Sequence, residues 1–145
     1  MGWIEKGWQE LSQRLAVALE PFRQGEDLLG VVHANQPGMF SAQLFAIGVT
    51  ATRLIVLPLD RRHERSGEPA IFSRADLEDA AVWGWGGSLA DFVSASAGRE
   101  VRFSAGGRRY KLMILGGNAL EDALSGADQQ RGLAVLLDFL RSAKR

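Results

Sequence analysis

The segment from Gln43 to Leu59, QLFAIGVTATRLIVLPL, constrains the fold more than any other stretch of the chain. Its aliphatic and β-branched residues suit a pleated, half-buried surface. A polar interruption from Thr50 to Arg53 divides the segment and disfavours a single long helix. We therefore predict two strands, at 43–49 and 53–59, joined by a tight turn at Thr50–Thr52.

Size and composition predict one ordinary globular domain. With 145 residues, of which 46% are hydrophobic, the chain can bury a sizeable core without disulfides or metals. The absence of cysteine excludes disulfides, thiolate catalysis and thiolate metal sites. The formal net charge of zero argues against a strong field for nucleic acid or anionic lipid, but leaves a local patch open.

The N-terminal sequence lacks the features of a targeting segment. Charged residues such as Glu5, Lys6 and Glu10 interrupt it, so there is no apolar signal-peptide core. No apolar run approaches the roughly 18 residues that a membrane-spanning helix needs. We expect a cytoplasmic protein.

Residues 3–20 are predicted to form an amphipathic helix that ends before Pro21. Its apolar residues recur at spacings of three and four and share one face; they are Ile4, Trp8, Leu11, Leu15 and Leu19. The helix can pack on its own domain, on a partner or second copy, or on a membrane. Its mixed charges favour packing on protein, because a membrane-lying helix has a face rich in Lys and Arg.

Five further strands complete the predicted sheet, and a short link at residues 70–72 precedes the fourth strand of the chain. The additional strands are at 28–34, 77–85, 89–95, 100–105 and 109–115. The last two form a hairpin that turns at Gly106-Gly107. One face of this hairpin is apolar, and the other carries Arg102, Arg109 and Lys111. This basic face is either an anion patch or a solvated sheet face with Glu100 as cross-strand partner.

Two helical segments follow the strands. Asn118 and Glu121 resemble a capping box that opens a short helix, and a final helix covers about residues 127–143. Leucines gather on one side of the final helix, which predicts deep docking on the sheet; they are Leu133, Leu136, Leu137 and Leu140. The predicted class is α+β, mainly β: a seven-stranded, bent antiparallel barrel capped by a C-terminal helix, with an extra N-terminal helix.

Three short motifs make this sequence resemble the bacterial pleckstrin-homology-like (PH-like) domains. Gly25-Glu26 leads into the first strand, VTATRLI at 49–55 is similar to the family's T-x-x-R-L turn, and IFSRADL at 71–77 is similar to its entry into the fourth strand. The resemblance implies a PH-like domain over residues 25–145, with the helix of residues 1–24 outside it. It implies a binding scaffold and no particular reaction. Lipid-binding members carry Lys and Arg after the first strand, whereas residues 34–48 contain none.

We therefore expect a non-catalytic PH-like module that binds a protein or peptide, or a second copy of itself. The expected contact residues are Trp3, Trp8 and Leu11 on the helix, with Met39 and Phe40 in the loop after the first strand. The alternative is a peripheral membrane module in which Met39 and Phe40 insert into anionic lipid and loop arginines supply charge. Those arginines are Arg61, Arg62 and Arg65.

No catalytic or metal-binding pattern stands out in the sequence. His33 lies within a predicted strand and His63 within a charged loop, and the two do not have metal-ligand spacing. We expect no enzyme activity, cofactor, metal or nucleic-acid partner.

Overall fold

The computed structural model describes residues 2–38, 42–83, 99–114 and 119–143. The helical elements are α1 (Gly2–Leu19), the short 3-10 helices η1 (Glu20–Phe22) and η2 (Arg74–Asp76), and α3 (Ala119–Ala143). The strands are β1 (Gly30–Gln36), β2 (Gln43–Val49), β3 (Arg53–Leu59), β4 (Ala70–Ser73), β5 (Glu78–Trp83), β6 (Arg99–Ala105) and β7 (Arg108–Ile114).

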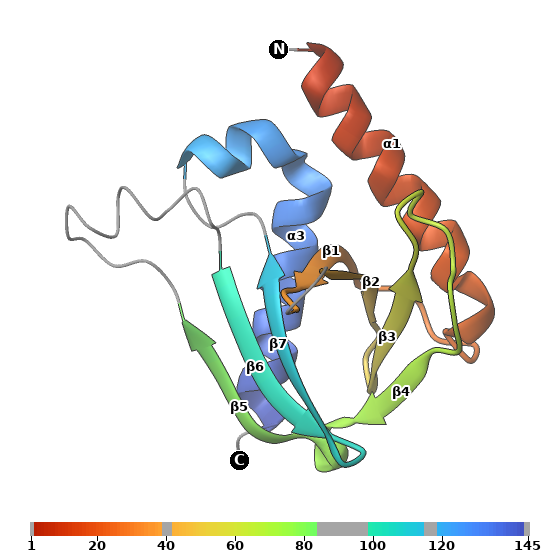
Figure 1. Cartoon of the computed structure of the whole chain (residues 1–145), viewed down its shortest axis with the longest axis vertical. Helices are drawn as coiled ribbons and strands as arrows, with labels where there is room; N and C mark the ends of the chain where they lie inside the picture. Colours follow the sequence, from red (N-terminus) through yellow and green to blue (C-terminus); the bar gives the residue numbers. More distant parts are fainter. Residues whose placement is uncertain (1, 39–41, 84–98, 115–118, 144–145) are drawn as a thin grey trace.

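The strands form one antiparallel sheet of seven, in the order β4-β3-β2-β1-β7-β6-β5. Figure 1 shows this sheet curled into a half-barrel, with α3 against its inner side and α1 along its outer side at β2 and β3. The predicted fold class is therefore confirmed. The predicted hairpin is also confirmed, because β2 and β3 pair in register from Leu44 opposite Leu59 to Val49 opposite Leu54.

One detail of the predicted strand list needs correction. Residues 70–72 belong to strand β4 and are not a link, because the segment pairs with β3, with Phe72 opposite Leu54. This strand has only 4 residues, which is too short for a sequence alternation to be distinguished from a loop. The predicted strand at 89–95 lies outside the described residues.

Both faces of the β2–β3 hairpin are buried, which explains its nearly continuous apolar sequence. Inward side chains such as Phe45 and Ile47 join the main core with α3. Outward side chains such as Ala46 and Leu57 join a second core with Leu15 of α1. Each helix therefore packs on a different face of the sheet, and the two helices also contact each other beside the start of β1.

The C-terminal part of the chain forms one helix where two were predicted. Ser125 and Gly126 do not end α3, which runs without a break over 25 residues. Helix stability in proteins comes mainly from packing, and the docked half of α3 buries Leu133, Leu136 and Leu140 in the main core. The predicted deep docking is confirmed, with Phe139 also buried and Leu137 only partly buried.

Helix α3 also covers part of one edge of β1. Strand β1 pairs with β7 at Asn35 opposite Met113. Nearer the start of β1, a side chain of α3 makes the hydrogen bonds that a neighbouring strand would make. The Gln129 carboxamide of α3 accepts from the His33 N–H at 3.1 Å and donates to the His33 carbonyl at 3.1 Å. Gly132 allows this approach, since a Cβ there would overlap the Val31 carbonyl.

Candidate functional site

A groove lies on the outer side of the molecule, between α1 and the β3–β4 loop (residues 60–69). Its volume is about 640 Å³. The lining residues are Glu10, Gln13, Arg14, Val17 and Ala18 from α1, with His63, Glu64 and Arg65 from the loop. Val17 is 68% exposed, so this α1–loop groove presents an apolar side chain among charges of both signs.

The loop wall of the groove is held in one conformation by Asp60. Its carboxylate Oδ1 accepts hydrogen bonds from the backbone N–H groups of Arg62, at 2.8 Å, and Glu64, at 3.1 Å. Its own N–H donates to the Glu64 carbonyl at 2.8 Å. The backbone donors of Glu64 and then Arg62 lower the pKa of Asp60 below its ordinary value. The Asp60 carboxylate therefore stabilises the turn at the start of its own loop.

Several contacts fasten this loop to the rest of the molecule. Arg14 of α1 donates to the Arg62 carbonyl at 3.1 Å. The Arg65 guanidinium lies 5.0 Å from the centre of the Phe22 ring and donates to the Gly67 carbonyl at 2.9 Å. Arg65 also pairs with Glu68 at 2.9 Å. The loop wall of the groove is thus held in place by contacts within the chain.

Two histidines meet beneath the loop. The rings of His33 and His63 lie edge to face with their centres 4.9 Å apart. His33 is half-buried on β1, and its burial lowers its pKa to about 4, with the neighbouring His63 adding to the shift. His33 is therefore neutral near pH 7. The backbone of His63 has a φ of 62°, a left-handed conformation that turns the loop back over the sheet.

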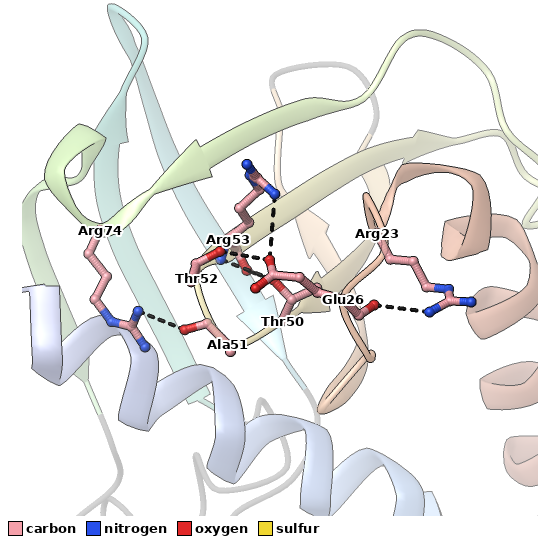
Figure 2. A network of polar contacts seen from close by, with 7 residues as sticks. All are labelled: Arg23, Glu26, Thr50, Ala51, Thr52, Arg53 and Arg74. Atoms are coloured by element: carbon pink, nitrogen blue, oxygen red, sulfur yellow. Dashed lines mark hydrogen bonds and ion pairs between the residues drawn. The ribbon is translucent and has the colours of Figure 1, made fainter.

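A separate polar network occupies the corner where the chain leaves α1 and enters β1 (Figure 2). The Glu26 carboxylate accepts from the Thr52 hydroxyl at 2.7 Å and the Thr50 hydroxyl at 2.9 Å, and lies 3.5 Å from the Arg53 guanidinium. These hydrogen bonds, led by that of Thr52, lower the pKa of Glu26, and the charge of Arg53 acts in the same direction.

Arg74 extends the same corner towards α3. Its guanidinium donates to the Ala51 carbonyl at 2.8 Å and to the Ser142 hydroxyl at 2.7 Å, and stacks 4.2 Å from the centre of the Phe139 ring. The three sequence motifs around Glu26, Thr50–Arg53 and Arg74 therefore meet in space (Figure 2). Because their polar groups satisfy one another, this corner acts as a structural clasp.

Glu100 forms ion pairs with two of the three cations on the basic face of the β6–β7 hairpin. Arg102 pairs with Glu100 at 2.9 Å and Lys111 with the same carboxylate at 3.4 Å. Arg102 and Lys111 are also direct cross-strand neighbours. Arg109 is exposed at the start of β7. Glu100 is thus a cross-strand partner of Lys111 and a same-strand partner of Arg102. The anion patch on this face stays a prediction.

The structure places the predicted contact residues unequally. Leu11 is partly buried in the second core between α1 and the sheet. Trp3 and Trp8 belong to α1, but their side chains lie outside the described part of the molecule. Met39 and Phe40 fall in a segment outside the described residues. Of the predicted loop arginines, Arg65 lines the groove, whereas Arg61 and Arg62 are exposed on the same loop but do not line it.

Sequence reasoning missed the α1 wall of the groove. Glu10, Arg14 and Val17 recur at spacings of four and three, which was a detectable signal for a second helical stripe. The apolar stripe with Leu15 and Leu19 was the stronger signal, and only that face of the helix was interpreted. The contribution of His63 had no local signal, because it depends on the loop folding back over β1.

No family model, curated protein or solved structure matches this chain. Within the ranges that the structure describes, no three His, Cys, Asp or Glu side chains gather as metal ligands. None of the described helices combines the length and apolarity that crossing a membrane requires.

Proposed function

We propose that this chain is a non-catalytic PH-like module that binds a segment of a protein or peptide, including a second copy of the chain, in the α1–loop groove. The observation that carries the proposal is a groove with two preformed walls and an exposed valine between charged side chains. A preformed site avoids the cost of ordering on binding.

The PH-like part of the proposal rests on topology and on the meeting of the three motifs. The curled sheet with strand order β4-β3-β2-β1-β7-β6-β5 and a C-terminal helix has the architecture that the resemblance implies. The absence of catalysis is supported by the use of polar groups. Asp60 holds its loop, and Glu26 holds the corner turn.

A random peptide library displayed on phage, selected against the full chain, tests the proposal. We expect enriched peptides to bind Val17→Glu and Glu64→Arg at least tenfold more weakly than the unmodified chain, about 1.4 kcal/mol. Both residues are exposed, so these variants should fold. Arg109→Glu changes charge on β7, away from the groove lining, and should bind normally.

Two results would reject the groove as the binding site. One is a selection that enriches no peptide, and the other is enriched peptides that bind all three variants equally.

Co-sedimentation with phosphatidylserine vesicles tests the membrane alternative through Met39, Phe40 and the loop arginines. Vesicle binding at low salt that is lost at high salt would favour that alternative.

A further inference from the structure

The outward side of α1 carries a second stripe besides the one that packs on the sheet. Gly7, Glu10, Arg14 and Val17 are all exposed, and their spacings of three and four residues align them on one face. Three of them line the α1–loop groove. Gly7 weakens an exposed helix, and a Cβ there would meet nothing of the chain within 4 Å.

We propose that this stripe receives the α1 helix of a second copy, packed antiparallel about a two-fold axis. In a two-fold contact the same patch of both copies faces itself. With the axis midway between Glu10 and Arg14, Glu10 of each copy faces Arg14 of the other, and Val17 lies across from Gly7. The inference rests on the proposed function, because it names one partner for the same groove.

The charges select this orientation. A parallel pair of helices would set Glu10 against Glu10 and Arg14 against Arg14, and like charges in contact are unfavourable. The Arg14 guanidinium gives one donor to the Arg62 carbonyl and has five N–H donors in all. Glu10 also takes part in an interaction within the chain. The formal net charge of zero imposes no long-range repulsion between copies.

The missing side chain at Gly7 gives the valine a place to pack. With no Cβ on Gly7, the backbone of one helix can approach the Val17 side chain of the other closely. The stripe from Gly7 to Val17 spans about 15 Å at about 1.5 Å per residue. A contact limited to a stripe of this length should bury much less than the roughly 800 Å² per partner of a stable interface. We therefore expect a reversible dimer with a dissociation constant of about micromolar order.

Charge exchange tests the pairing. Sedimentation equilibrium from about 1 to about 500 µM protein should show the unmodified chain passing from monomer to dimer. E10R alone and R14E alone should each weaken the dimer at least tenfold, because each sets like charges face to face. The double variant E10R/R14E should recover the dimer, since it restores opposite charges. R109E makes the same charge change as R14E on β7 and should dimerise normally.

Cysteine cross-linking tests the geometry independently, because the chain has no native cysteine. A disulfide needs two Cα atoms within about 7 Å. Mixed G7C and V17C proteins should therefore form a covalent dimer on mild oxidation, whereas each variant alone should remain monomeric on a non-reducing gel.

A monomer over the whole concentration range, or a double variant that fails to recover, would overturn the inference. Cross-linking of G7C with itself as efficient as that of the mixture would also overturn it, because an antiparallel pair keeps the two copies of residue 7 too far apart for a disulfide. If the chain stays monomeric while groove-dependent peptides still bind, only the dimer fails. If neither the second copy nor any peptide depends on the groove, the proposed function fails as well.

Discussion

The two helices pack on opposite faces of one sheet and contact each other beside β1, but they differ in how deeply they are buried. Helix α3 places Leu133, Leu136, Phe139 and Leu140 in the main core and comes close enough to β1 for Gln129 to bond its backbone. Helix α1 buries only Leu15 and Leu19 fully among its described hydrophobic side chains, and its outward stripe stays exposed. The comparison teaches that α3 completes the fold, whereas α1 combines a modest docking face with an exposed outward stripe.

The largest expected effect comes from shortening a core leucine on each helix. Leu136→Ala should cost about 3–5 kcal/mol, because Leu136 is fully buried among side chains of the main core. Leu15→Ala should cost less, about 2–3 kcal/mol, because α1 can loosen without opening the barrel. Urea unfolding gives both values.

Hydrogen exchange sharpens this comparison. Leu136→Ala should increase exchange across the whole sheet, whereas Leu15→Ala should increase it mainly in α1 and the outer side of β3. Equal increases in exchange across the whole sheet for both variants would contradict the view that α1 contributes less to stability than α3.

Glycine-to-alanine changes on the two helices should have opposite signs. Gly132→Ala should destabilise the protein by about 3 kcal/mol, because its Cβ would overlap the Val31 carbonyl and push α3 off β1. Gly7→Ala adds a Cβ in open space and should stabilise α1 by up to about 1 kcal/mol. Thermal and urea unfolding measure both. A neutral Gly132→Ala would mean that α3 does not approach β1 so closely.

Mild acid should weaken the contact between β1 and the loop. The pKa of His33 is lowered from 6.5 to about 4 in the folded chain, so between these values the unfolded chain binds more protons. Stability should therefore fall as the pH drops through this window, by about 3 kcal/mol in all. Urea unfolding at a series of pH values measures it. His33→Gln should flatten the profile between pH 4 and 6.5, and an unchanged profile would exclude His33 as its source.

The smallest expected effect is at the clasp beside α1. Glu26→Gln weakens the interactions with Thr50, Thr52 and Arg53 on an exposed corner and should lower the unfolding midpoint only slightly. The pKa of Glu26 is lowered from 4.5, so its stabilising contribution is present above that pH and is lost as the pH falls below it. The acid limb of the profile below pH 4.5 should be shallower in Glu26→Gln, while the His33 window stays unchanged.

Local patterns predicted much of this fold. The β2–β3 hairpin, the alternation in β6 and β7, and the apolar stripes of α1 and α3 all follow from residue spacing. The short strand β4 was missed because its identity depends on pairing with Leu54 and its neighbours. The full length of α3 was missed because Ser125-Gly126 has a local preference that the docked helix overrides.

For the candidate site, the sequence supplied the loop arginines and the amphipathic helix but did not bring them together. Residues 14 and 62 meet only because the β3–β4 loop folds back over the sheet beside α1. His33 and His63 are likewise brought together by tertiary structure. Such contacts are set by chain topology, and local residue patterns do not encode which distant segments will become neighbours.

By itself, the sequence determined which segments become strands and helices and which of their faces seek burial, since these properties depend on spacing along a few residues. Tertiary structure alone decided that the Gln129 side chain would bond the backbone of His33. It also decided that Gly132 would lie against the backbone of β1, and that α1 and a charged loop would line a groove. The physical reason is that each of these features joins groups far apart in the chain, and only closure of the sheet around a common core fixes their distance.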